Sequence, residues 1–463
     1  METGMARMLH AVQEPEEQAI SARRPSRLAA LRANPLPEGT FTVGSGLVIA
    51  GIASYLFLAI SARALGPDLF APLSVMWVIT FLAGPGFFLP VEQEVTRALA
   101  HRRANGVGGG PVIVRAAKLG GILAAILVVV SLIFSPLIVK HLFDGYWWLF
   151  VGFLLGLVGY YAGHLGRGTF SGMGRFGAYG LYMGSEGVIR MAFCVALASV
   201  GVKAVGAYGI AVGIPPLLAV ALAVRRERNL YEPGPEAPWG EVSSNLGWLL
   251  AGSVLAAFMV NAGPIAVTIL ATPDQKSLAG KFTTSTVIAR VPLFLFQAVQ
   301  ASLLPKLALL VGAGRFTDFR AGLRRLLTAV SGLGVAAIVG AFLIGPLVVR
   351  ILFGPDYDLG RRNLTMLAAS AALYMVAITM SQAIIALHGH ARVAIGWAVG
   401  VVVFVVVTAL GNDLLLRVEM GLVVGSAASV LALWLLLRSL MKRGGVPDEE
   451  SLVEAFQDLP LEP

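Results

Sequence analysis

Long apolar segments alternate with short polar breaks along most of the chain. Each of twelve segments is long and apolar enough to form a helix that spans roughly 30 Å of hydrocarbon. The twelve segments lie at residues 40–62, 69–90, 114–138, 146–165, 177–200, 204–223, 244–270, 281–304, 326–351, 363–387, 392–411 and 419–438. The pattern therefore predicts an all-α integral membrane protein with about 12 transmembrane helices.

The longest polar break, residues 225–242, contains three prolines and a run of arginine and glutamate. It separates six apolar segments from six others, which predicts two six-helix bundles joined by a cytoplasmic linker. The predicted organisation is a cytoplasmic polar tail at 1–38, an N-terminal bundle at 39–223, the linker at 224–243, a C-terminal bundle at 244–440 and a second cytoplasmic tail at 441–463.

The two predicted bundles share a sequence repeat. An offset of 210 residues aligns residues 135–143 (SPLIVKHLF) with residues 345–353 (GPLVVRILF), and it also aligns Arg115 with Arg325. Because each half has an even number of helices, the repeat is parallel, with its axis along the membrane normal. Two such bundles are expected to leave a V-shaped cleft between them, and rocking one against the other would give alternating access.

The composition fits a membrane protein and excludes several other classes. Hydrophobic residues make up 57% of the 463 positions and charged residues only 13%, and the mean hydropathy is +0.79. A soluble domain has far more charge on its surface. The single cysteine excludes a disulfide framework. The sequence contains no metal-ligand cluster, nucleophile–base set or nucleotide motif, so neither a cofactor nor an enzymatic reaction is expected.

The net charge of +9 is explained by membrane topology rather than by nucleic acid. With the N-terminus inside, 24 lysines and arginines fall on the cytoplasmic side of the twelve segments and 9 on the outer side. This bias predicts a multi-pass protein of the bacterial cell membrane with both termini in the cytoplasm. The first 38 residues lack the apolar core of a cleavable signal peptide.

Two charged residues lie near the middle of the fifth predicted helix. Glu186 and Arg190 are four residues apart, so they share one helix face and can pair. An unpaired charge at the bilayer centre costs roughly 2.5–3.5 kcal/mol, so such groups face a bundle interior or a wet cavity. Two interpretations stay open: an ion pair that locks neighbouring helices, or part of a cavity that binds an anionic head group.

A third charge, Arg290, lies in the eighth predicted helix near two prolines, Pro292 and Pro305, which disturb helical hydrogen bonding. A buried guanidinium beside such a break has a rigid fork of donors suited to phosphate oxygens. Alternatively, Arg290 reaches the membrane surface or binds freed backbone carbonyls. Gln297 is expected on the same face, and Asn261, in the seventh helix, is a weaker candidate for the same cavity.

Other polar elements are expected to have simpler roles. The glycine-rich segment 167–179 is expected to form a cytoplasmic turn anchored by Arg167 and Arg175. Glu92 and Glu94 are expected no deeper than the membrane surface. Glu186 is then the only carboxylate expected at mid-membrane, which makes it the candidate for coupling transport to an ion.

Four short motifs occur in the order and spacing of a known family. The first is ARALGP at 62–67, whose short Ala-Leu-Gly-Pro turn is expected to join the first two helices as a hairpin. The others are RGTFSGMGRF at 167–176, ARVP at 289–292 and LPKLA at 304–308. With these motifs, residues 40–440 resemble the polysaccharide flippases (the O-antigen, capsule and exopolysaccharide exporter type) of the multidrug/oligosaccharidyl-lipid/polysaccharide exporter superfamily. Ala71 departs from the glycine expected after the aromatic residue.

The resemblance implies an alternating-access flippase that moves a polyprenyl-pyrophosphate-linked oligosaccharide from the inner to the outer leaflet. Arg190 and Arg290 would then contact the pyrophosphate. The expected partners are the lipid-linked oligosaccharide, membrane lipids, a polysaccharide polymerase and glycosyltransferases. Three alternatives remain: a cation-coupled drug or metabolite antiporter of the same superfamily, a membrane glycosyltransferase or ligase, and a non-transporting scaffold for envelope assembly.

Overall fold

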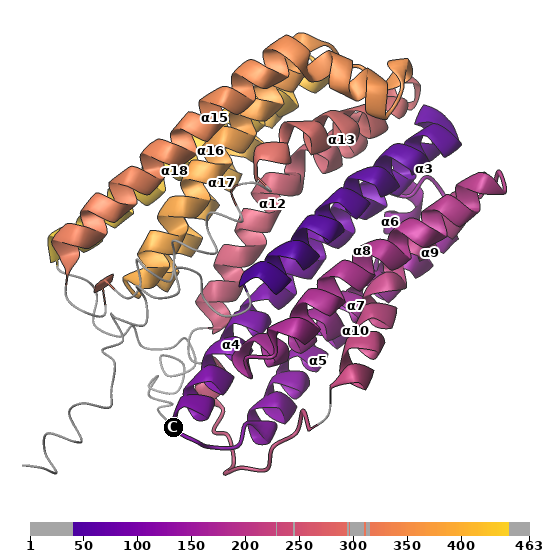
Figure 1. Ribbon diagram of the computed structural model, residues 1–463. Coiled ribbons are helices and arrows are strands. Elements are labelled where there is room, and N and C mark those ends of the chain that lie inside the picture. Colours follow the sequence, from indigo (N-terminus) through magenta and orange to yellow (C-terminus); the bar gives the residue numbers. More distant parts are fainter. Residues whose placement is uncertain are drawn as a thin grey trace, which may run out of the picture. The chain divides into compact units, whose positions relative to one another are not determined.

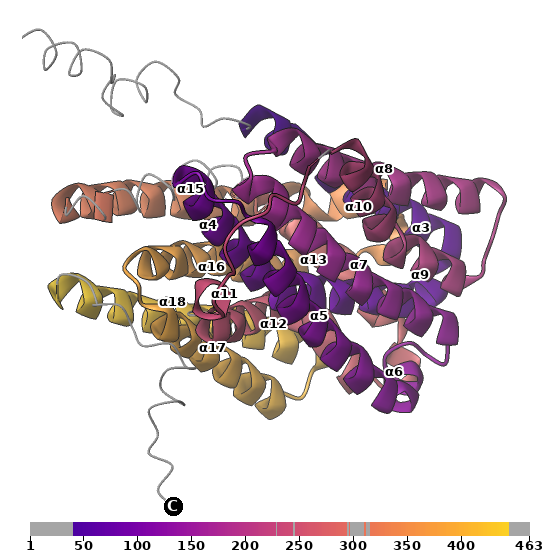
Figure 2. The ribbon, with the colours of Figure 1, turned by 90° about the horizontal axis from the view of Figure 1, so that it is seen from below.

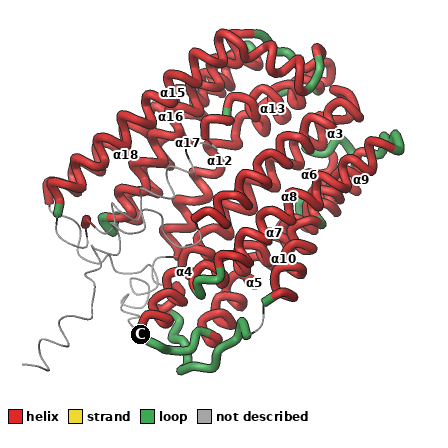
Figure 3. Tube along the Cα trace, in the orientation of Figure 1, coloured by secondary structure: helices red, strands yellow, loops and turns green. Residues whose placement is uncertain are grey.

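The computed structural model describes residues 40–227, 229–243, 246–293, 296, 310–311 and 315–443. Within these residues the chain is helical and contains no strand (Figure 3). Ten helical segments are long and apolar enough to cross a membrane. Nine of them match predicted segments one to one, and the tenth, Phe41–Ala104, contains the first two predicted segments. The predicted all-α membrane fold is therefore confirmed.

The first two predicted helices form a hairpin within α3 (Thr40–Ala83). Gly66 has φ 78° and ψ 168°, a conformation that favours glycine, and Pro67 follows it. Phe57 stacks on Trp77 with ring centroids 5.3 Å apart, although 20 residues of straight helix would separate them by about 30 Å. The chain therefore reverses at Gly66, as the short Ala-Leu-Gly-Pro turn predicts.

The rest of the N-terminal half surrounds α7 (Figure 1). Its elements are η1 (Gly84–Phe88), α4 (Leu89–Ala104), α5 (Gly110–Ile133), α6 (Ser135–His141), α7 (Trp147–Gly172), α8 (Phe176–Ser199), α9 (Val205–Gly213) and α10 (Pro215–Arg226). Glycines on α7 let its neighbours approach closely. A Cβ at Gly152 would meet a backbone oxygen of α9 at 2.5 Å, and one at Gly163 would meet the Tyr182 hydroxyl at 2.1 Å. Small residues allow such packing where lipid provides no hydrophobic driving force.

The C-terminal half repeats the same helical order. Its elements are α11 (Gly240–Ser243), α12 (Leu246–Leu270), η2 (Pro273–Gln275), α13 (Ser277–Ala289), α15 (Phe316–Leu352), η3 (Pro355–Tyr357), α16 (Arg361–Ala386), α17 (His390–Leu410) and α18 (Leu414–Arg443). Helices α15 to α18 group together, apart from α7 to α10 (Figure 2). Helix α13 is the described part of the eighth predicted segment, and the remainder of that segment lies largely outside the described residues.

The repeated segments occupy matching positions. Val139 and its counterpart Val349 are both buried, as are Phe143 and its counterpart Phe353, and all four belong to one apolar cluster. A left-handed glycine follows each segment, at Gly145 and Gly354. The repeat therefore lies in equivalent local structure in both halves.

The linker is fastened to the N-terminal half. Arg102 of α4 donates to both carboxylate oxygens of Glu241 at 2.7 Å. Arg115 of α5 donates to Glu236 at 3.0 Å and stacks over the Trp239 ring at 4.2 Å. These contacts place residues 236–241 with the N-terminal helices, up to the point where α12 begins.

The two halves also meet beside the Gly66 turn. The Tyr357 hydroxyl donates to the carbonyl oxygen of Ala62 at 2.8 Å, and its ring packs edge-on against Phe70. The Arg63 guanidinium donates to the carbonyl of Leu352 at 2.8 Å, at the C-terminus of α15, where cations are favoured. These contacts join the turn in the middle of α3 to η3 and to the end of α15.

Candidate functional site

Glu186 and Arg190 form the predicted ion pair on α8. Arg190 donates to Oε1 of Glu186 and, at 3.3 Å, to the hydroxyl of Tyr160 on α7. Tyr160 in turn donates to Glu186 at 3.3 Å. Arg190 also reaches Ser54 Oγ of α3 at 3.3 Å. Three helices therefore converge on one buried pair.

The pair is closed off from solvent. Arg190 is 2% exposed and Glu186 6%. The guanidinium lies over the rings of Trp77 and Phe81, 5.3 and 5.6 Å from their centroids. In this conformation the pair has the geometry of a structural lock, and contact between Arg190 and a substrate would require these rings to separate. Its role in substrate binding stays a prediction.

Arg290 lies where α13 ends. The helix stops at Ala289, three residues before Pro292, which agrees with the predicted proline break. Nη1 of Arg290 donates to Oδ1 of Asn261 on α12 at 3.3 Å. The Asn261 amide is itself oriented by donating to the Ala257 carbonyl at 2.9 Å. The structure therefore brings together two of the predicted cavity residues, whereas Gln297 lies outside the described residues.

The surroundings of Arg290 contain aromatic hydroxyls rather than carboxylates. Tyr55 and Tyr374 lie close enough to act electrostatically on the guanidinium. Among the described residues no Asp or Glu acts on it or pairs with it. A cation placed this way has its charge uncompensated within that part of the chain, and it retains donors for an incoming anion.

Helix α3 connects the two arginine sites. Its adjacent residues Ser54 and Tyr55 contact different halves: Ser54 accepts from Arg190, and the Tyr55 hydroxyl donates to the carbonyl of Val287 on α13 at 3.2 Å. A movement of α3 therefore changes contacts at Arg190 and near Arg290 together.

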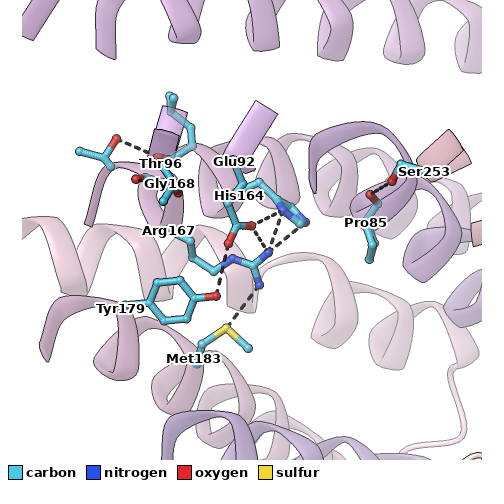
Figure 4. Close-up of polar contacts among 11 residues, drawn as sticks. Pro85, Glu92, Thr96, His164, Arg167, Gly168, Tyr179, Met183 and Ser253 are labelled. Atoms are coloured by element: carbon cyan, nitrogen blue, oxygen red, sulfur yellow. Dashed lines mark hydrogen bonds and ion pairs between the residues drawn. The ribbon is translucent and has the colours of Figure 1, made fainter. Parts of the chain in front are cut away.

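Helix packing covers both Glu92 and Glu94, whereas their expected depth, at the membrane surface, stays a prediction. Glu92 is 8% exposed and Glu94 4%. Glu94 pairs with Arg97 at 2.8 Å. Glu92 lies 2.8 Å from Nδ1 of His164, accepts from Arg167 and accepts from the Tyr179 hydroxyl at 3.3 Å (Figure 4).

The structure corrects the expected role of Arg167 and adds a buried carboxylate that was not expected. Arg167 belongs to α7, which continues to Gly172, so it is a buried partner of Glu92 rather than the anchor of a turn. Glu419, in α18, is a further buried carboxylate at 1% exposure, and neither of its oxygens has a hydrogen-bond partner in the described part of the chain. Glu186 is therefore not the only carboxylate inside the bundle.

The sequence carries a signal for the burial of His164 and of Glu419, although not for the residues that they contact. His164 stands alone in a long apolar segment, which is a signal for a buried polar contact. Glu419 is three residues from buried Leu422, on the same helix face. The described residues contain no group of three His, Cys, Asp or Glu able to hold a metal ion.

No protein-family model matches the chain. Two mycobacterial proteins, both called uncharacterized, are similar over most of it. Rv1510 of Mycobacterium tuberculosis is 28% identical over 411 residues, which is 86% of this chain and 91% of the relative. Mb3654 of Mycobacterium bovis is 25% identical over 403 residues, 84% of this chain and 88% of the relative.

Solved structures identify the fold. An inward-facing multidrug resistance MATE family transporter of the MOP superfamily matches with a TM-score of 0.67 at 15% identity, covering 87% of this chain and 98% of the other. An outward-facing structure of a transporter of that family matches with a TM-score of 0.62 at 16% identity, covering 88% and 97%. The chain therefore has the MATE transporter fold.

Proposed function

We propose that the protein is an alternating-access flippase that moves a polyprenyl-pyrophosphate-linked oligosaccharide across the membrane. Its fold is that of transporters solved in both inward-facing and outward-facing states. Fold alone does not determine the substrate, so the proposal depends on the chemistry of the site.

The observation that carries the proposal is the uncompensated charge of Arg290. Its guanidinium contacts only a neutral amide and lies near two tyrosines, among the described residues. A half-buried cation inside a membrane protein without an opposite charge is costly, and a bound pyrophosphate would offset that cost through charge-assisted, bidentate hydrogen bonds. Asn261 and Tyr374 would add neutral donors for phosphate or sugar oxygens.

A cation-coupled drug antiporter is the second candidate, favoured because the solved transporters of the same fold are multidrug resistance transporters. A cationic drug would be repelled by Arg290, and Glu186 is already bound by Arg190 and Tyr160. Glu419 is the buried carboxylate that leaves room for this alternative, because both its oxygens lack partners among the described residues.

Reconstitution into liposomes separates the two candidates. Liposomes would contain the purified protein with either a polyprenyl-pyrophosphate oligosaccharide or a cationic dye. The flippase proposal predicts protein-dependent transfer of the sugar to the opposite leaflet without dye movement, and loss of transfer in Arg290→Ala. Arg324→Ala, an exposed arginine of α15, is the matched control and should transport normally. Dye movement with a static glycolipid would establish the antiporter instead.

A further inference from the structure

Three polar side chains meet inside the N-terminal half: Glu92 of α4 with His164 and Arg167 of α7, here called the Glu92 triad (Figure 4). Oε2 of Glu92 accepts from Nη2 of Arg167 and lies 2.8 Å from Nδ1 of His164. The same Nη2 lies 2.7 Å from the same Nδ1. Each of the three atoms is therefore within hydrogen-bonding distance of both others.

Nδ1 of His164 is the atom of this triangle that can either carry a proton or lack one. Guanidinium only donates and carboxylate only accepts, whereas Nδ1 of an imidazole does either according to its protonation. Without a proton, Nδ1 accepts from Arg167, but its lone pair faces a carboxylate oxygen at 2.8 Å. With a proton, Nδ1 donates to Glu92, and Arg167 can keep only its bond to the carboxylate. The proton on Nδ1 thus decides whether Arg167 binds both Glu92 and His164 or Glu92 alone.

The charges around the triad balance until that proton arrives. Among the described residues, the charged groups that act on Glu92 and His164 from outside the pair are Arg167 of α7 and Glu186 of α8. The other elements packed on α7, which are η1, α5, α6, α9 and α10, add none to this set. Glu186 is balanced by Arg190, and Glu94 of α4 by Arg97. A proton on the triad therefore adds a net positive charge to a balanced interior.

Helix α8 is fastened to the triad by two side chains. The Tyr179 hydroxyl donates to Oε1 of Glu92 at 3.3 Å, and Arg167 approaches Sδ of Met183 at 3.4 Å. Arg167 keeps 15% of its side-chain surface exposed and Glu92 10%, against 4% for His164. Arg167 is thus the most exposed member of the cluster, and a shift of Arg167 would change how α8 sits against α4.

We propose that the Glu92 triad is a proton-binding site whose occupancy controls the packing of α8 against α4, and that it couples proton uptake to transport. The second half of this statement rests on the proposed function. During alternating access the triad would be exposed first to one side of the membrane and then to the other. The proton that it carries between the two sides would supply the driving force. Glu186, held by Arg190 and Tyr160, then acts as a fixed structural ion.

Histidine-labelled full-length protein in lipid nanodiscs allows the site to be observed without substrate. Nuclear magnetic resonance across about pH 4.5 to 9 would follow the signals of the six histidines separately, and the signal that disappears in His164→Gln should itself show a proton step. In Glu92→Gln the proton affinity of His164 should fall by more than about tenfold, because the opposite charge in contact is gone. His101→Gln, an exposed histidine of α4, is the matched control and should leave the step unchanged.

Hydrogen exchange of α8 provides the second readout. Exchange over Phe176–Ser199 should depend on pH in the unmodified protein and lose that dependence in His164→Gln. Matching melting temperatures would confirm that both variants fold, and Glu92→Gln serves as the second variant if His164→Gln does not.

Three results would overturn the proposal. If His164 does not titrate, or titrates equally in Glu92→Gln, the triad holds no shared proton. If it titrates but α8 exchange ignores pH, the site binds a proton without moving the helix. If both readouts behave as expected but glycolipid transfer ignores a pH gradient, the coupling is wrong. A complete absence of glycolipid transfer with both readouts intact would instead count against the proposed function alone.

Discussion

The two halves share a fold, but they treat buried charge differently. In the N-terminal half, Glu92 meets Arg167 and Glu186 meets Arg190, so each buried ion has an opposite partner. In the C-terminal half, Arg290 and Glu419 have no ionic partner among the described residues. Paired ions fix helices to one another, whereas unpaired ions keep binding capacity for something that arrives. We therefore expect the proposed substrate contacts in the second half, whereas the ion pairs of the first half hold helices together and include the proposed proton site.

The largest expected effect comes from breaking a pair. Arg190→Ala leaves the Glu186 carboxylate buried and alone, and this should destabilise the protein by about 3–5 kcal/mol. Thermal unfolding in detergent would measure the loss. The double variant Glu186→Gln with Arg190→Ala should recover much of it, since no stranded charge remains. A single variant as stable as the parent would show that the pair is not a lock.

Removing the unpaired charge of Arg290 should reduce transport without reducing stability. Arg290→Ala deletes a cation that no described carboxylate compensates, so the melting temperature should not fall. Glycolipid transfer should nevertheless drop by at least about tenfold, because one charge-assisted contact is worth roughly 1.5–3 kcal/mol. Arg290→Lys should transfer partially, since lysine keeps the charge but loses the bidentate fork. Unfolding of Arg290→Ala would mean that Arg290 supports the fold.

The carboxylates allow the same comparison. Glu419→Gln removes a charge whose oxygens lack described partners and should leave stability unchanged or higher. Glu186→Gln weakens an ion pair to Arg190 and should lower stability by about 3 kcal/mol. Parallel denaturation curves would rank them. If both variants lost the same amount of stability, the buried carboxylates of the two halves would not differ in the way described here.

The smallest effect is expected at Tyr179. Tyr179→Phe deletes one 3.3 Å hydrogen bond to Glu92 while the ion pair to Arg167 remains. The cost should be about 1.5 kcal/mol, the low end for a hydrogen bond to a charged group, because the 3.3 Å distance is long. A loss as large as that of Arg190→Ala would mean that Tyr179 is essential to the triad rather than an accessory to it.

Sequence patterns predict the local features of this molecule and not the distant contacts. Hydrophobic segments predict the helices, the Ala-Leu-Gly-Pro turn predicts the hairpin at Gly66, and the i, i+4 spacing predicts the Glu186–Arg190 pair. Each of these depends on residues that are neighbours in the chain. Spacing alone carries that information because helix geometry is fixed.

The Glu92 triad lies beyond such reasoning because 72 residues separate Glu92 from His164. Their contact depends on how α4 packs against α7, which no periodicity in either helix specifies. The burial of Glu419 likewise depends on which neighbours cover α18. Position near a predicted helix end gives no sign that packing covers a side chain, yet Glu92, Glu94 and Glu419 are all buried.

Binding of a polyprenyl pyrophosphate to the purified protein tests the central claim most directly. Native mass spectrometry or a fluorescence competition assay would compare the parent, Arg290→Ala and the control Arg324→Ala. The account predicts at least about tenfold weaker binding for Arg290→Ala, with Arg324→Ala unchanged, because Arg290 is half-buried with no described carboxylate beside it whereas Arg324 is exposed. Equal affinity for all three proteins would contradict it.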